Sequence, residues 1–254
     1  MKSVIDSQIP TIDHLESLKG KIVLVTGATG GLGRVVVKCL LETAAVVAAV
    51  YRDEARFQDL LAFVGGAQES LTGFKADVTL EKSVGDMVEA VMRRHGRIDV
   101  LLNLVGTYRG GVDISTTGVN DWDFLMGTNL KSAFLCSKAV LPAMMKADSG
   151  RIVCVAARPA VEKKGRAKSG AYAVSKAGVV ILTETIAEET RKFGITANCI
   201  LPGTIDSPDN RKSFSGADFS KWVKPEEIAA VLLFLISDGS SIVSGASIPV
   251  YGKS

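Results

Sequence analysis

The stretch KIVLVTGATGGLG, residues 21 to 33, decides the fold, because an apolar strand runs directly into a glycine-rich turn that opens a helix. Glycine has a physical use at each of three places: a tight turn at Gly27, close approach of backbone to a pyrophosphate at Gly31, and close helix packing at Gly33. The anion would lie at the positive end of the helix dipole. We therefore predict a nucleotide-binding turn between the first strand and the first helix.

The alternation of strand and helix continues outward from this turn along the chain. Strands are expected at 21–27, 45–51, 71–77, 98–106, 151–157 and 195–201, and helices at 31–44, 81–95, 121–146 and 170–193. The strands are apolar throughout, as in a parallel sheet covered on both faces. We predict an α/β fold with a doubly wound, mostly parallel, Rossmann-like sheet. Residues 1–18 are expected to form an N-terminal extension and residues 19–254 a single dinucleotide-binding domain.

Composition excludes several classes of function. Hydrophobic residues make up 47% of the chain, and 30 basic against 27 acidic residues leave a net charge of +3. This balance is too slight for a nucleic-acid or membrane-surface protein, so small molecules are the expected partners. Apolar stretches such as 44–50 are far shorter than the roughly 20 residues of a membrane-spanning helix. Residues 1–21 show no apolar core of a secretory signal, and a cytoplasmic location is expected.

The cysteines and histidines do not predict a metal site. Four cysteines stand far apart in apolar runs, and we expect buried free thiols at Cys39, Cys136, Cys154 and Cys199. Only two histidines, His14 and His95, are present, so a histidine-rich zinc centre is not expected.

The stretch AYAVSK, residues 171 to 176, places a tyrosine and a lysine four positions apart in a segment that reads as a helix. Positions i and i+4 share one helix face, so the phenol of Tyr172 and the ammonium of Lys176 are expected to lie close together. A nearby cation lowers the pKa of a tyrosine, which suits proton transfer near neutral pH. The same spacing also occurs where a helix has one core contact and one solvated charge.

These two motifs resemble those of the short-chain dehydrogenase/reductase family, whose phosphate loop follows TGxxxGxG and whose active site carries YxxxK. Further matches follow in order: ADV at 76–78, Asn129 in GTNLKSAF, and LPGTIDS at 201–207. The resemblance runs from about residue 19 to the end. It implies hydride transfer between a nicotinamide cofactor and a carbonyl or secondary alcohol carbon.

The resemblance also implies the site residues. Tyr172 would transfer the proton, Lys176 would tune the phenol and bind the nicotinamide ribose, and Asn129 would support a water linking the site to solvent. The cofactor-binding residues implied by the family pattern are Gly27, Thr29, Gly31, Leu32, Gly33, Arg52, Asp77, Val78, Asn103, Gly106, Tyr172, Lys176, Pro202, Gly203, Ile205 and Ser207.

The choice between the two nicotinamide cofactors falls on the end of the second strand, VYRDE. An acid there holds the 2′-hydroxyl of NAD, whereas an arginine accommodates the 2′-phosphate of NADP. Tyr51 stands where the family usually has the NAD-selecting acid, and Arg52 follows where it has the NADP-selecting base. NADPH is the expected cofactor. NAD is the alternative, with Asp53 as its ribose ligand, and Arg52 could also be a solvated side chain without a role.

Two departures from the family pattern bear on activity. The usual NNAG after the fourth strand reads Asn103, Leu104, Val105, Gly106. After the fifth strand, Ala156 and Ala157 stand where the family has the serine that hydrogen-bonds the substrate oxygen. Loss of one such donor costs about 2.7 to 4 kcal/mol of transition-state stabilisation. Ser169 could replace it, although the N-cap of the following helix is the expected role. The alternative function is an impaired NAD(P)-binding sensor or a structural oligomer.

Two segments flank the expected site. Residues 158–168 carry five basic side chains against one acid, which would attract an anionic substrate or form a solvated loop. Residues 207–222 occupy the place of the family's substrate lid, and their polarity indicates an open pocket. The family resemblance also implies a homodimer or homotetramer assembled through helices 121–146 and 170–193, and the apolar C-terminal segment is expected to add a further contact.

Overall fold

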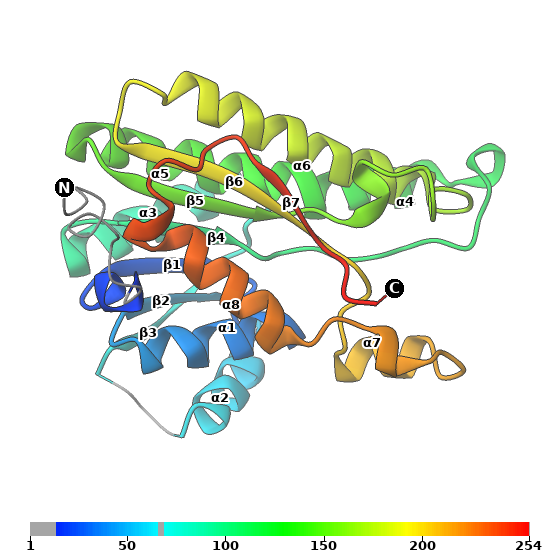
Figure 1. The fold of residues 1–254 in the computed structure, drawn as a ribbon, viewed down its shortest axis with the longest axis horizontal. Helices are drawn as coiled ribbons and strands as arrows, with labels where there is room; N and C mark the ends of the chain where they lie inside the picture. Colours follow the sequence, from blue (N-terminus) through cyan, green and yellow to red (C-terminus); the bar gives the residue numbers. More distant parts are fainter. Residues whose placement is uncertain (1–13, 66–68, 254) are drawn as a thin grey trace, which may run out of the picture.

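A seven-stranded parallel sheet forms the centre of the computed structural model, which describes residues 14–65 and 69–253 (Figure 1). The strand order is β3-β2-β1-β4-β5-β6-β7. The strands are β1 (Ile22–Thr26), β2 (Val46–Tyr51), β3 (Leu71–Lys75), β4 (Val100–Asn103), β5 (Gly150–Val155), β6 (Ile195–Pro202) and β7 (Ser247–Val250). The order reverses between β1 and β4, and ligands of doubly wound sheets bind outside the carboxyl ends of the strands at such a reversal.

Helices cover both faces of the sheet (Figure 1). One face packs against α3 (Glu81–His95), α5 (Ser132–Ala147) and α6 (Gly170–Glu189), and the other against α1 (Gly31–Glu42), α2 (Glu54–Phe63) and α8 (Pro225–Ile236). Two shorter helices are α4 (Val119–Leu125), which contacts α6, and α7 (Pro208–Ser213). Strand β1 supplies both cores, because its alternate side chains point to opposite faces: Leu24 joins one cluster and Val25 the other.

The predicted fold class is confirmed, and the helix expected at 81–95 has those bounds. The helix expected at 121–146 consists of three parts, since a π-helical turn, Met126–Lys131, joins α4 to α5. The sequence pattern predicts no helix or strand at the positions of α2, α7, α8 and β7. β7 contains Pro249, which a strand tolerates at the edge of a sheet, and β7 pairs with β6 alone.

The start of the described chain packs onto the domain. His14–Leu18 form a 3₁₀ turn, and the Leu18 side chain is fully buried in the same core cluster as α8. Asp238 N donates to Ser17 Oγ at 3.1 Å. Ser17 and Leu18, which belong to the proposed N-terminal extension, therefore contact the domain, and residues 1–13 lie outside the described part. Among the described residues, no helix combines the length and apolarity that crossing a bilayer requires.

Candidate active site

The residues predicted from the sequence gather at the carboxyl ends of the strands. The glycine-rich turn follows β1, Arg52 follows β2, Asp77 and Val78 follow β3, and Gly106 follows β4. Tyr172 and Lys176 are on α6, and Pro202 ends β6. The site therefore lies across the reversal of strand order between β1 and β4.

The glycine-rich turn needs glycine at two positions for geometric reasons. Gly27 has φ +68°, in the left-handed region. A Cβ on Gly33 would lie 2.0 Å from Gly27 O, so the first turn of α1 packs directly on the loop. At Gly31 a Cβ would lie 2.9 Å from Ser207 Cβ. Gly31 thus brings the segment after β6 against the turn in this structure.

The turn has the donors that a pyrophosphate requires. Gly30 is the N-cap of α1 and has no side chain with which to cap the helix, so side-chain capping does not occupy the first amide groups. Thr29 and Leu32 lie near Gly30 in the chain, and the partly buried side chain of Leu32 packs against the core. The helix dipole adds positive potential at the same place. The residues present fit a dinucleotide phosphate.

The end of β2 separates the two candidates for ribose recognition. Asp53 Oδ1 accepts from Ala55 N at 2.9 Å and from Arg56 N at 3.4 Å, so its carboxylate caps α2. Arg52 is exposed, and its charge helps to lower the pKa of Asp77, although hydrogen bonds from Thr79 are the larger cause. Arg52 and Asp77 therefore face one area, whereas Asp53 is engaged elsewhere.

The loop after β4 is held in two ways. The Asn103 amide points into the core, where Nδ2 donates to Ser137 Oγ at 3.2 Å, so its backbone rather than its side chain faces the site. A Cβ on Gly106 would lie 2.8 Å from Lys176 Nζ. The end of the lysine side chain therefore packs against the loop at Gly106 in this conformation.

The segment after β6 crosses the site toward α7. Gly203 N donates to Val250 O at 3.0 Å, and Ile205 forms an isolated bridge with Val223. Ser207 caps α7, its Oγ accepting from Asn210 N at 3.3 Å. The segment thus forms a fixed connection over the glycine-rich turn, and it includes Pro202, Gly203, Ile205 and Ser207.

Tyr172 lies half-buried near the start of α6, beside the ring of Tyr108. Burial raises the pKa of Tyr172 well above its usual range, and Tyr108 adds to the rise. The expectation that Lys176 lowers this pKa is not met in this conformation. Tyr172 is therefore a phenol, and a proton donor, at neutral pH.

The Lys176 ammonium is turned toward the sheet. Nζ donates to Val155 O at 2.7 Å, at the carboxyl end of β5, and the side chain is only 4% exposed. Burial lowers the pKa of Lys176 to about 8, against a small opposing effect of Cys199 and Cys154. The side chain is a buried cation beside the site, and it donates its hydrogen bond to a strand carbonyl.

Asn129 connects the loop after β4 to α6. It lies in the π-helical turn, Oδ1 accepts from Thr107 N at 2.8 Å, and Nδ2 donates to Thr107 O at 3.0 Å and to Ser175 Oγ at 2.9 Å. Ser175 Oγ in turn donates to Tyr172 O at 2.8 Å. The π-helical turn thus places Asn129 where it fixes both elements that carry the site.

Neither alanine after β5 supplies a donor side chain, and Ser169 is engaged elsewhere. Ala156 and Ala157 are both buried. Ser169 occupies the N-cap position of α6, but its hydroxyl makes no capping hydrogen bond, so the expected capping role is wrong. The hydroxyl donates back to Gly165 O at 2.5 Å and contacts Arg166 O at 3.2 Å, because the preceding loop folds over it.

Comparisons with known proteins agree with this geometry. The family model of short chain dehydrogenases matches residues 21–218. The chain belongs to the short-chain dehydrogenase/reductase family. That membership makes it an oxidoreductase and confirms the resemblance noted in the sequence.

Relatives align over nearly the whole chain. A 3-oxoacyl-[acyl-carrier-protein] reductase FabG of Thermotoga maritima is 33% identical, over 92% of this chain and 98% of the relative. A D-threitol dehydrogenase of Mycolicibacterium smegmatis is 31% identical, over 95% of each chain. The solved structure "ElxO with NADP Bound" superposes with a TM-score of 0.86 at 24% identity, over 92% of this chain and 98% of that one, which shows a shared fold.

The basic segment 158–168 is less free than its composition indicates. Arg158 Nε pairs with Glu162 Oε2 at 2.7 Å, and Arg166 donates to Pro159 O and Ala160 O at 2.8 and 3.0 Å. Its exposed cations include Lys163, Lys164 and Lys168. Part of the segment's charge is thus used to hold the loop itself.

Sequence reasoning missed three residues of this short-chain dehydrogenase site, Thr107, Tyr108 and Ser175. Thr107 and Ser175 hold Asn129, and Tyr108 covers Tyr172. An aromatic residue two positions after Gly106 was a signal for Tyr108. The lid, expected to leave an open pocket, places Phe214 near Tyr108, at 6.3 Å between ring centroids.

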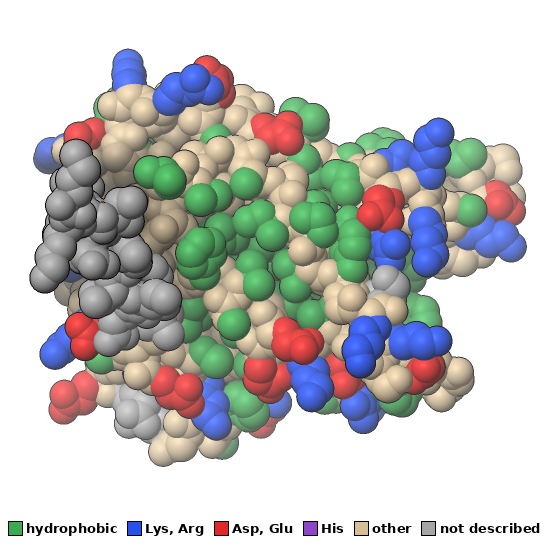
Figure 2. Space-filling view, viewed as in Figure 1, with side chains coloured by type: hydrophobic (Ala, Val, Ile, Leu, Met, Phe, Trp, Pro, Cys, Tyr) green, Lys and Arg blue, Asp and Glu red, His purple; other side chains and the backbone are tan. Residues whose placement is uncertain are grey.

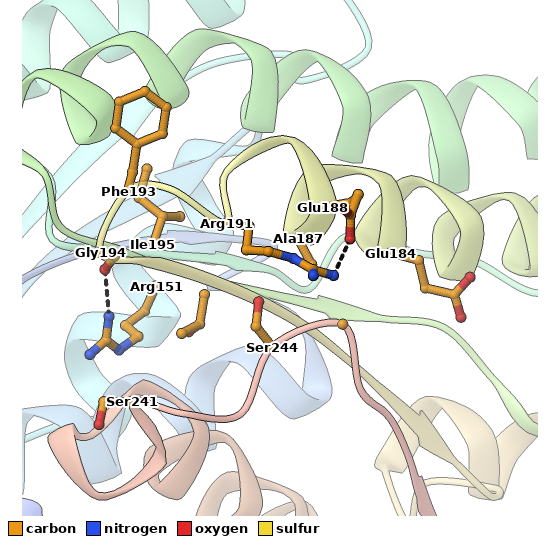
Figure 3. Close-up of a pocket in the computed structure, with 12 residues that line it drawn as sticks. Arg151, Glu184, Ala187, Glu188, Arg191, Phe193, Gly194, Ile195, Ser241 and Ser244 are labelled. Carbon is orange, nitrogen blue, oxygen red and sulfur yellow. Dashed lines mark hydrogen bonds and ion pairs between the residues drawn. The ribbon is translucent and has the colours of Figure 1, made fainter.

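A cavity of about 520 Å³ lies elsewhere, at the amino ends of β5 and β6 (Figure 3). Its wall includes Arg151, which donates to Gly194 O at 3.1 Å, and the Arg191–Glu188 ion pair (Figure 3). In a parallel sheet this is the edge opposite Tyr172. Within residues 14–65 and 69–253, no group of three His, Cys, Asp or Glu side chains is arranged to hold a metal ion.

Proposed function

We propose that the chain is an NADPH-dependent reductase, or reversible dehydrogenase, that acts on a carbonyl or secondary alcohol. The observation that carries this proposal is the convergence of Tyr172, Lys176 and Asn129 beside a glycine-rich turn whose geometry fits a dinucleotide phosphate. Bound NADPH would supply the hydride to the carbonyl carbon. Tyr172 would donate its proton to the carbonyl oxygen, and its phenol is protonated at neutral pH, as this role requires.

Each site residue has a task that its position supports. Asn129 holds the loop after β4 against α6, which keeps Tyr172 in place. Lys176 would turn from Val155 O toward the nicotinamide ribose, and its buried charge would help the proton to leave Tyr172. Gly27, Gly31 and Gly33 would carry the phosphates, with Thr29 and Leu32 beside them. Asp77 and Val78 would meet the adenine, and Gly106, Asn103 and the 202–207 segment the nicotinamide side.

NADPH rather than NADH is proposed because of the end of β2. Arg52 is exposed beside Asp77, where a 2′-phosphate would form a charge-assisted hydrogen bond with it. Asp53, the residue on which NAD recognition would depend, caps α2. The solved structure of ElxO, which shares this fold, has NADP bound.

The names of the relatives indicate the reacting group of the proposed substrate. Relatives named as 3-oxoacyl thioester and polyol enzymes favour a carbonyl or secondary alcohol as the reacting group. A panel of a 3-oxoacyl thioester, a diketone, a quinone and an aldose, each with NADPH and NADH, tests the proposal. NADPH oxidation with at least one of them is expected, and none with any would contradict it.

A second function is favoured by one observation. No serine stands at Ala156 or Ala157, and the Ser169 hydroxyl donates to Gly165 O, so the family's second donor to the substrate oxygen is missing. An impaired NAD(P)-binding sensor or structural oligomer would have this arrangement. Tight NADPH binding without turnover of any panel member would favour it.

A homodimer or homotetramer is also proposed. Apolar side chains remain exposed along α4, α5 and α6, among them Phe124, Phe134 and Ile181. Figure 2 shows hydrophobic side chains gathered over the face that carries α8 and β7, where Phe234 and Ile242 are exposed. Apolar surface of this kind marks contacts between copies. No nucleic-acid or membrane partner is proposed, and a cytoplasmic location stays a prediction.

A further inference from the structure

A continuous group of aromatic rings covers the proposed proton donor. The Tyr108 ring meets Tyr172 edge to face, with centroids 5.0 Å apart and planes at 80°. Phe214 lies 6.3 Å from Tyr108 and 6.2 Å from Trp222. Two separate segments, the loop after β4 and the lid after β6, therefore meet through rings directly over Tyr172.

These rings are not explained by the cores of the domain. Tyr108 is 51% exposed and Phe214 is 42% exposed, and neither packs in the two core clusters. Both rings therefore keep exposed aromatic surface within the group of rings that includes Tyr172.

The backbone holds Tyr108 in this orientation from both sides. Thr107 N donates to Asn129 Oδ1 at 2.8 Å, and Gly111 N donates to Lys168 O at 2.7 Å. A Cβ on Gly110 would lie 2.2 Å from the Tyr108 hydroxyl oxygen, so a side chain there would displace the phenol from this position. The hydroxyl rests against Gly110, and the ring is the part that faces Tyr172.

We propose that Tyr108 and Phe214 form an aromatic clamp that selects carbonyl substrates carrying an aromatic ring and directs their carbonyl oxygen to Tyr172. This inference rests on the proposed reductase function and adds its substrate class. Aromatic rings attract one another in edge-to-face and offset arrangements beyond the effect of their buried area. Two such contacts correspond to about a tenfold preference for an aromatic over an alicyclic substrate of the same shape.

The test compares phenylacetone with cyclohexylacetone, whose unconjugated carbonyl groups have similar reactivity. The ratio of their kcat/KM values with NADPH is expected to be about ten or more in the wild type. Tyr108→Leu and Phe214→Leu should each lower it to about three, because each leaves one of the two ring contacts, whereas Tyr108→Phe, which keeps the ring, should retain it. Phe63→Leu is the matched control, because Phe63 is also an exposed ring, 40% accessible, but lies at the end of α2 with Arg34 and Lys38 over it.

Binding of the two ketones to NADP⁺-loaded protein, where hydride transfer is blocked, gives a second reading of the same ratio. Reduction of both ketones with equal kcat/KM, or an unchanged ratio in Tyr108→Leu, would overturn the clamp and leave the reductase function standing. Selective binding of phenylacetone without any reduction would support the clamp and contradict the function. Loss of the ratio in Tyr108→Phe would assign the effect to the hydroxyl and overturn the clamp. Neither binding nor reduction of either ketone would overturn the clamp, and the reductase function would then be decided separately by the panel of four carbonyl compounds.

Discussion

Replacing Lys176 by methionine is predicted to stabilise the protein while removing its activity. Lys176 is an almost fully buried cation whose pKa is lowered from 10.5 to about 8 by burial, which means that the fold disfavours its charge. Methionine has a similar length and no charge to desolvate. We expect this because Lys176 serves the reaction, while its buried charge lowers the stability of the fold.

The magnitude follows from the difference between the two pKa values. At about 1.36 kcal/mol per pKa unit, it corresponds to about 3 kcal/mol at pH 7. Loss of the hydrogen bond to Val155 O offsets part of this, so a gain of about 1 to 3 kcal/mol in the free energy of unfolding is expected. Between pH 8 and 10.5 the unfolded chain binds a proton that the folded chain does not, so the wild type gains stability as pH rises through this window. The advantage of the variant should therefore fall below about 1 kcal/mol at pH 10.

Urea unfolding of cofactor-free protein at pH 7 and pH 10 measures both quantities. Lys163→Met, which removes an exposed lysine, is the control and should change little at either pH. A Lys176→Met variant that is less stable than the wild type at pH 7, by the same amount at pH 10, would refute the reasoning. The ammonium would then be stabilised where it lies.

Three further predictions concern the cofactor, the missing donor and assembly. Arg52→Ala should weaken NADPH binding about 10- to 100-fold and leave NADH binding unchanged. Titration of both cofactors measures these affinities. Tighter binding of NADH than of NADPH by the wild type would contradict the proposed preference for NADPH. Ala157→Ser should raise the reduction rate by up to about a thousandfold, whereas Ser169→Ala should leave the rate intact and cost about 1 kcal/mol of stability. Rate loss in Ser169→Ala would show instead that Ser169 is the donor. Light scattering at micromolar concentration should give a dimer or tetramer mass, and a monomer would exclude assembly through α5 and α6.

Local pattern predicts the elements whose burial is uniform. The central strands are apolar throughout because both faces are covered, and α3 has one apolar face and the left-handed cap Gly96 at its end. The pattern fails for α8, which is apolar on nearly all sides. It fails for β7, where Pro249 opposes a strand assignment that only an edge position permits.

The candidate site divides in the same way. Spacing along α6 is enough to place Tyr172 and Lys176 on one element. It does not give side-chain direction, which depends on contacts between segments far apart in the chain. Lys176 turns to Val155 O, Asn103 points into the core, and the Ser169 hydroxyl returns to its own loop. Tyr108 and Phe214, over one hundred positions apart in the numbering, meet only in the folded chain.

Transfer of deuterium from NADPH to product tests the central claim most directly. NADPH labelled at each of the two C4 positions in turn is incubated with carbonyl substrate and either the wild type or Tyr172→Phe, and the alcohol is analysed by mass spectrometry. The wild type is predicted to transfer the label from one position only, and Tyr172→Phe to bind NADPH with similar affinity but form almost no alcohol. Unlabelled alcohol from both forms of NADPH, or equal label transfer by Tyr172→Phe, would contradict the account.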